Sequence, residues 1–143
     1  MSTDKNKAVV RRFIEEVFVK GNVAAVDEFA AADFVPHSWA SVKPGIENLK
    51  QAVTRVSSGL SDVRMTIEDM IAEGDKVSVR LTAHAVHKGD FMGMPATGKS
   101  YTISETHIFC VADGKIVEHW RDADLLGMMQ QLSMSPAPGK GGN

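Results

Sequence analysis

The sequence predicts a single α+β domain in which a cone-shaped, curved antiparallel sheet wraps around N-terminal helices. Before Gly59, apolar residues recur at three- and four-residue spacing, which is typical of amphipathic helices. After Gly59 the period changes to two, which is typical of half-buried strands. Helices followed by a strand meander indicate an α+β fold, and a sheet curled around a helix encloses an apolar interior.

The first expected helix spans about residues 4–20. Ser2, Thr3 or Asp4 could cap its start, and Gly21 ends it. The caps on both sides of an apolar stripe therefore predict one long amphipathic helix at the N-terminus.

Two shorter helices are expected next, over about residues 23–31 and 45–58. Residues 34–39 lie between them and are expected to be extended, because Pro36 disfavours helix for the residue before it. This arrangement predicts a helical layer that is complete before the strands begin.

The strands follow in a meander. A hairpin turn is expected at residues 73–76, and a second turn at residues 112–114 leads into the last strand. The strand over 77–87 alternates cleanly, and one face should carry Val77, Val79, Leu81, Ala83, Ala85 and His87. In the last strand the shared face should carry Ile116, Glu118, Trp120 and Asp122, which would leave His119 on the outer face or at a subunit interface. A short amphipathic helix over about 125–132 completes the domain.

Composition narrows the possible functions. The chain has 143 residues and a formal net charge of −2, so it offers no electrostatic footprint for nucleic acid or an anionic membrane. No apolar run is long enough to span a bilayer, and residues 1–7 are polar, which makes a cytoplasmic protein the default expectation. The single cysteine, Cys110, is expected to be buried and inert. Residues 1–132 should form the domain, and residues 133–143 a flexible tail rich in Gly and Pro.

Three motifs carry a resemblance to a known family. They are Asp33-Phe34-Val35-Pro36-His37, the Gly-rich loop from His87 to Lys99, and the run from Gly114 to Leu132. Together they resemble the SnoaL-like polyketide (ester) cyclases of the nuclear transport factor 2-like superfamily, a cystatin-like α+β barrel. The resemblance covers about residues 6–132. It implies a conical pocket and cofactor-free acid/base chemistry on a carbonyl compound, such as an intramolecular aldol closure.

The resemblance maps the family's catalytic aspartate onto Asp124, and Asp122 is a second candidate two residues earlier. A carboxyl group at the edge of an apolar cavity is suited to remove a proton next to a carbonyl and to protonate the new alkoxide. Asp is also a preferred helix cap, so Asp124 could instead cap the Leu-Leu-Gly helix that follows it. The sequence leaves both roles open.

Three histidines are further candidates. His37 is expected at the cavity mouth, where it could donate a hydrogen bond to a substrate carbonyl or could satisfy backbone groups of its turn. His107 shares a strand face with Glu105, and this pair would orient the ring inside the cone or form an ion pair at a subunit interface. His87 ends its strand beside the Gly-rich loop and could anchor that loop or contact ligand.

The remaining candidates are wall residues. Methionine, phenylalanine and tryptophan side chains would give adaptable or flat apolar surfaces for a planar or polycyclic ligand, although each is also an ordinary core residue. The residues expected to line the pocket in this way are Trp39, Phe91, Met92, Trp120 and Met128.

Two other ligand classes are not expected. The five histidines show no ligand spacing such as His-x-x-x-His, so no metal site is expected. Residues 93–100 fit the bare phosphate-loop pattern Gly-x-x-x-x-Gly-Lys-Ser, but a strand rather than a helix follows them. Nucleotide binding is therefore not expected, because no helix N-terminus would meet the phosphate.

The sequence thus favours a homodimer, formed through the outer sheet face, that binds a small or polycyclic apolar carbonyl compound. A polyketide-cyclase-like lyase or isomerase without a cofactor is the leading hypothesis. Epoxide hydrolysis and ketosteroid isomerisation are alternatives on the same scaffold, and the segment Arg80-Leu81-Thr82 lacks the carboxylate that the first of these would need. A non-catalytic binder of an apolar metabolite is the rival from a different class.

Overall fold

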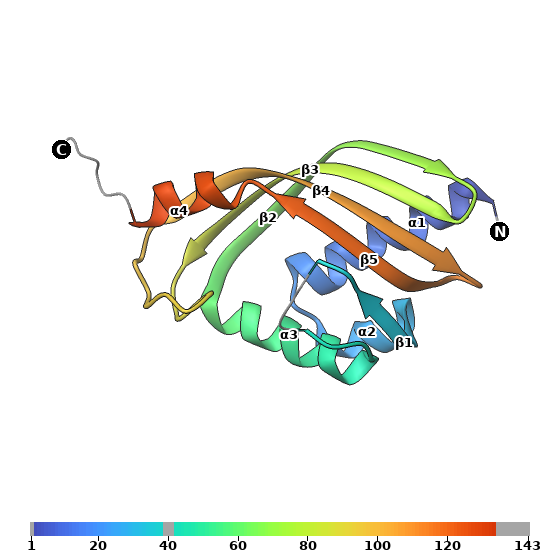
Figure 1. Ribbon diagram of the computed structural model, residues 1–143, viewed down its shortest axis with the longest axis horizontal. Coiled ribbons are helices and arrows are strands. Elements are labelled where there is room, and N and C mark those ends of the chain that lie inside the picture. Colours follow the sequence, from blue (N-terminus) through green and yellow to red (C-terminus); the bar gives the residue numbers. More distant parts are fainter. Residues whose placement is uncertain (1, 39–41, 134–143) are drawn as a thin grey trace.

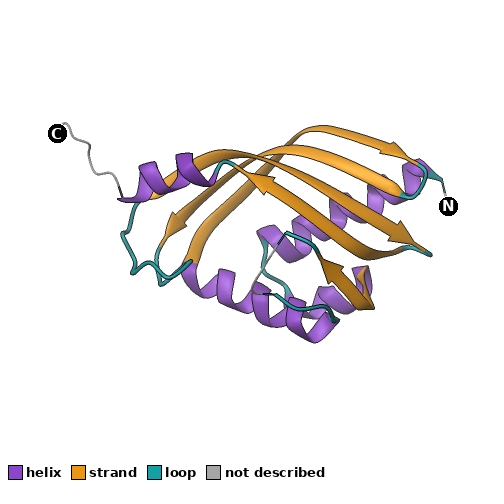
Figure 2. Cartoon of the chain, viewed as in Figure 1, coloured by secondary structure: helices purple, strands orange, loops and turns teal. Residues whose placement is uncertain are grey.

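The computed structural model describes residues 2–38 and 42–133, and it places a curved sheet over a layer of helices (Figure 1). Figure 2 shows the helices of the first half of the chain gathered on the concave side of the strands. The elements, in chain order, are α1 (Thr3–Phe13), η1 (Ile14–Val19), η2 (Val23–Ala25), α2 (Val26–Phe29), β1 (Ala30–Pro36), α3 (Ile46–Gly59), β2 (Leu60–Glu73), β3 (Lys76–His87), β4 (Ser100–Ala112), β5 (Lys115–Ala123) and α4 (Leu125–Ser133).

The N-terminal helix forms where the sequence predicts it. The Ser2 side chain caps α1 by accepting a hydrogen bond of 3.1 Å from the Lys5 backbone N–H. The helix continues into the π-helical turn η1 and ends before Gly21, which has φ +65°. This left-handed conformation favours glycine, and a side chain there would also have to displace the Ser57 hydroxyl.

The five strands lie in the order β1-β5-β4-β3-β2. Strands β2 to β5 pair antiparallel, as the meander predicts. Residues 34–36 of the segment expected to be extended belong to β1, which pairs parallel with β5 at the sheet edge. This strand already begins at Ala30, so the expected helix over 23–31 ends at Phe29. The α+β fold class with a curved sheet around N-terminal helices is confirmed.

The concave face of the sheet carries the core. The predicted row on β3 is confirmed, because all six of its inward residues are buried, from Val77 to His87. Helix α1 and the turn after it supply Phe13 and Phe18, whose rings pack against Phe109 at centroid distances of 5.9 and 6.4 Å. The thiol of Cys110 is buried, as expected.

The predicted facing of β5 is wrong, and a β-bulge is the reason. Ile116 lies opposite Val111, but Glu118 lies opposite Cys110, so the register shifts by one residue at Val117. Beyond the bulge the alternate residues exchange faces. His119, expected outside, is therefore fully buried on the concave side, whereas the side chains of Trp120 and Asp122 lie on the outer face.

Among the helices of the described residues, none is long and apolar enough to cross a membrane.

Candidate functional site

Four ionisable side chains meet on the concave face where β4 lies beside β5. The Glu105 carboxylate accepts two hydrogen bonds from the Arg121 guanidinium, of 2.8 Å from Nη2 and 3.3 Å from Nε. It also accepts one of 2.8 Å from His107 Nε2. The other ring nitrogen of His107, Nδ1, lies 2.8 Å from His119 Nε2. We call these four residues the inner cluster.

Sheet geometry brings the inner cluster together. His107 lies directly opposite Arg121 across the β4–β5 ladder, and Glu105 precedes His107 by two residues, so all three point to one face. The bulge in β5 adds His119 to the same face. Glu105, His107 and His119 are 3%, 1% and 0% exposed, whereas the Arg121 side chain is 29% exposed. Arg121 is therefore the member of the cluster that a ligand can reach first.

Burial and pairing set the charges of the inner cluster. Burial alone would raise the pKa of Glu105, but hydrogen bonds from His107 and Arg121 outweigh it and lower that pKa to about 2. Burial is the main reason why the pKa of His119 lies well below its usual value, and the electrostatic effects of His107, Arg121 and His37 lower it further. At neutral pH the cluster thus contains a paired carboxylate and guanidinium and a neutral His119.

Two phenylalanine rings pack against the imidazoles of the inner cluster. The Phe109 ring stacks on both imidazoles, with centroid distances of 5.8 Å to His107 and 4.6 Å to His119. Phe18 covers the same pair at 5.7 and 5.6 Å. An unpaired charge is costly in such an apolar environment, so the hydrogen bonds from His107 and Arg121 are what keep the Glu105 carboxylate ionised there.

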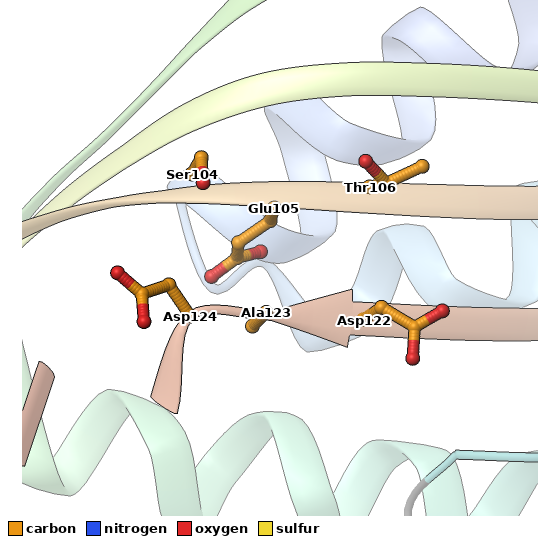
Figure 3. Close-up of a pocket in the computed structure, with 6 residues that line it drawn as sticks. All are labelled: Ser104, Glu105, Thr106, Asp122, Ala123 and Asp124. Carbon is orange, nitrogen blue, oxygen red and sulfur yellow. The ribbon is translucent and has the colours of Figure 1, made fainter. Parts of the chain in front are cut away.

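The two aspartates expected to be catalytic lie at the exposed end of β5. Figure 3 shows the carboxylates of Asp122 and Asp124 pointing in opposite directions beside a shallow pocket of about 180 Å³. Asp124 Oδ1 accepts a hydrogen bond of 2.9 Å from the Gly127 N–H, which confirms the capping role. A side chain at Gly127 would overlap this carboxylate, which explains the glycine in the Leu-Leu-Gly run. Whether either aspartate also moves protons stays a prediction.

His37 lies on the outer face of β5 rather than on the side of the inner cluster. Its Nε2 lies 2.8 Å from Glu118 Oε1, and its ring stacks on Trp120 with a centroid distance of 4.5 Å and an interplanar angle of 8°. The structure thus separates His37 and Trp120 from His107 by the thickness of the sheet. Trp39, the other predicted tryptophan of the pocket, lies outside the described residues.

The predicted residues of the Gly-rich loop lie at the far end of β3. His87 is 0% exposed, and its Nδ1 lies 3.0 Å from Thr97 Oγ1. Its Nε2 is buried without a hydrogen-bond partner among the described residues. Phe91 packs edge-on to this ring at 6.4 Å, whereas Met92 is 56% exposed. Met128 of α4 is buried in the core.

Sequence reasoning missed Arg121 and Tyr101 and misplaced His119. Tyr101 is buried on the same face of β4 as Glu105. Burial, together with the charge of Glu105, raises the pKa of Tyr101 to about 12, so it stays a protonated donor. The signal for Tyr101 was present in the alternation with Glu105 and His107. Arg121 had no such signal, because its facing depends on the bulge.

Within residues 2–38 and 42–133, no group of three His, Cys, Asp or Glu side chains is arranged so that it could hold a metal ion.

The chain is 30% identical over 128 residues to the aklanonic acid methyl ester cyclase DnrD of Streptomyces peucetius, covering 87% of this chain and 88% of that protein. It is 29% identical over 120 residues to the nogalonic acid methyl ester cyclase of Streptomyces nogalater, covering 80% and 88%.

Among solved structures, TsrD from Streptomyces laurentii superposes with a TM-score of 0.84 at 27% identity, covering 93% of this chain and 98% of that one. IdmH from Streptomyces antibioticus superposes with a TM-score of 0.76 at 27% identity, covering 89% and 97%. The family model described as SnoaL-like polyketide cyclase matches residues 8–132. The chain therefore belongs to the SnoaL-like polyketide cyclase family.

Proposed function

We propose that this protein is a cyclase-type enzyme that closes a ring in a polyketide-like methyl ester by acid/base catalysis without a cofactor. The observation that carries the proposal is the inner cluster, in which a carboxylate, a guanidinium and two imidazoles are hydrogen-bonded on the concave face of the sheet beside Phe18 and Phe109. Removing such charges from water opposes folding unless they are well paired, and strongly perturbed groups in a concave site are typical of catalytic centres. The family relatives named above as methyl ester cyclases support the substrate class.

Arg121 is assigned the contact with substrate. Two of its nitrogens bind Glu105, and its partly exposed guanidinium keeps further N–H groups for an incoming carbonyl oxygen. A donor aimed at this oxygen stabilises the enolate that forms when the neighbouring carbon loses a proton. Because Glu105 already balances the charge of Arg121, the site suits a neutral ester or ketone better than a carboxylate.

His107 is assigned the proton transfer. Its Nε2–H is held by the Glu105 carboxylate, so Nδ1 is the nitrogen that can accept a proton. His119 relays it, taking the substrate's proton at its own Nδ1 while its Nε2, 2.8 Å from His107 Nδ1, passes a proton on. The Glu105 carboxylate then stabilises the imidazolium. The enolate carbon attacks a second carbonyl of the same molecule, the new C–C bond forms, and His107 returns the proton to the alkoxide. Atoms balance without an added reactant.

The test uses aklanonic acid methyl ester and nogalonic acid methyl ester as probes, with chromatography and mass spectrometry to detect a product of unchanged mass. His107→Asn should lower kcat by about 100-fold or more, because it removes the proton acceptor. Asp124→Asn keeps an oxygen that can cap α4 and is the matched control, with kcat expected to stay within about twofold of wild type.

Two results would contradict this assignment. Loss of turnover in Asp124→Asn or Asp122→Asn, with turnover retained in His107→Asn, would move the chemistry to the exposed carboxylates. Tight binding of the probes with no turnover would favour the non-catalytic binder. Two further expectations stay predictions. One is a homodimer formed through the outer sheet face, and the other is the lyase or isomerase class of the reaction.

A further inference from the structure

The two residues that follow β1 lie against the edge of β5. The backbone ladder of β1 with β5 runs as far as Pro36 opposite His119. Beyond it, the His37 N–H donates a hydrogen bond of 2.8 Å to the His119 carbonyl oxygen. The Ser38 Oγ accepts one of 2.7 Å from the Arg121 N–H. The backbone groups held in this way belong to two members of the inner cluster.

The same short segment also holds the outer face of β5. His37 stacks on Trp120, the residue between His119 and Arg121, and its Nε2 contacts the carboxylate of Glu118. One stretch of β5, residues 118–121, is therefore fixed at its edge by backbone hydrogen bonds and on its outer face by a ring stack and a polar contact.

We propose that His37 and Ser38 form an edge clamp that positions His119 and Arg121 for the inner cluster. The guanidinium of Arg121 meets Glu105 through two hydrogen bonds, and such a two-point contact tolerates little displacement of the backbone that carries it. Ser38 is a positioning residue, because its hydroxyl holds the Arg121 backbone and does not itself reach the cluster. The effect of the clamp on turnover rests on the proposed function, but its effect on cluster geometry does not.

The first experiment needs no substrate. Ring ¹⁵N signals of the histidines and the Nε–H signal of Arg121 are recorded by NMR on the full chain, with assignments from His107→Asn and His119→Asn. Ser38→Ala removes the acceptor of the Arg121 N–H, and we expect it to shift the signals of His107, His119 and Arg121. Ser38→Thr keeps a hydroxyl acceptor and should restore them.

Ser58→Ala is the matched control. The Ser58 hydroxyl also makes one bond to a backbone group, donating to the Arg55 carbonyl oxygen at 2.9 Å, but it lies on α3. It should leave the cluster signals unchanged. Ser38→Cys, which keeps the volume but is a weak acceptor, should lie between Ala and Thr and gives a second variant if Ser38→Ala folds poorly. Unchanged cluster signals in Ser38→Ala, or equal shifts in the Ala and Thr variants, would overturn the clamp.

A turnover measurement separates the clamp from the proposed function. With the methyl ester probes, Ser38→Ala should lower kcat about tenfold with KM nearly unchanged, and Ser38→Thr should recover it. Turnover that is lost in His107→Asn but is unaffected in Ser38→Ala would contradict the clamp alone. Shifted cluster signals in Ser38→Ala, with turnover that His107→Asn does not reduce, would support the clamp and refute the proposed function.

Discussion

The two faces of β5 both carry ionisable residues, but they differ in how far water reaches those residues. On the concave side, His119 and Arg121 join a network that is almost closed to water. On the outer side, Glu118 and Asp122 carry carboxylates that face solvent. A charge pair interacts weakly where water screens it and strongly where water is excluded. An ionisable group on the concave face of the sheet should therefore affect the stability and chemistry of the domain more than one on the outer face.

The largest expected effect comes from removing the carboxylate of the inner cluster. Glu105→Gln keeps the volume but leaves the Arg121 charge without its counterion, and should lower the free energy of unfolding by about 3 kcal/mol or more. Glu118→Gln, on the outer face and in contact with His37, is the matched control and should change it by about 0.5 kcal/mol or less. Urea unfolding at pH 7 measures both. Equal losses of unfolding free energy in the two variants would contradict the difference between the concave and outer faces.

Protonation of Glu105 at low pH should remove the contribution of its carboxylate to the free energy of unfolding. The pKa of Glu105 is lowered from 4.5 to about 2, so its ionised form is favoured in the folded state. The resulting stability is fully present above the unfolded value and is lost as pH falls from about 4.5 toward 2, by up to about 3 kcal/mol in total.

The measurement is the difference in unfolding free energy between wild type and Glu105→Gln across this range. The difference should shrink as pH falls, because protonation of Glu105 makes the wild type resemble the variant. A difference that stays constant between pH 4.5 and pH 2 would contradict the lowered pKa.

The contrast also shows which parts could be read from sequence. The alternation of β3 is unbroken, so its inward row follows from a period of two alone. In β5 one extra residue, Val117, inverts every side chain after it, and no residue type marks that bulge. A period of two alone therefore places His119 on the wrong face and gives no signal that Arg121 faces the core.

Local chemistry was easier to predict than pairing across strands. The capping role of Asp124 involves residues three positions apart, and both were visible in the sequence. The contacts of Arg121 join residues 16 positions apart and depend on how two strands are aligned. The Glu105–His107 pair was predicted because its members share one strand, whereas its extension to His119 and Arg121 required the sheet.

A smaller effect is expected at the cap of α4. Asp124→Ala removes the bond to the Gly127 N–H and should lower the free energy of unfolding by about 1 kcal/mol, with Asp124→Asn close to wild type.

Gly127→Ala should destabilise the wild type, because its new methyl group would overlap the Asp124 carboxylate. In the Asp124→Ala background the same change should stabilise by up to about 1 kcal/mol, since alanine is the better helix former.

This reversal of sign is measured by thermal or urea unfolding of the two single variants and the double variant. A Gly127→Ala effect that is the same in both backgrounds would show that the carboxylate does not lie over the first turn of α4. The helix would then begin without the cap that this end of β5 provides.

The smallest expected effect is at Asp122. It is exposed, lies opposite Thr106 on the outer face, and points away from Asp124 (Figure 3). Asp122→Asn should therefore change the free energy of unfolding by less than about 0.5 kcal/mol. If the chemistry belongs to the concave face, it should also leave kcat for the methyl ester probes within about twofold of wild type. A large loss of kcat with unchanged stability would assign catalysis to the outer end of β5, since a carboxylate that does not support the fold would then be essential for turnover.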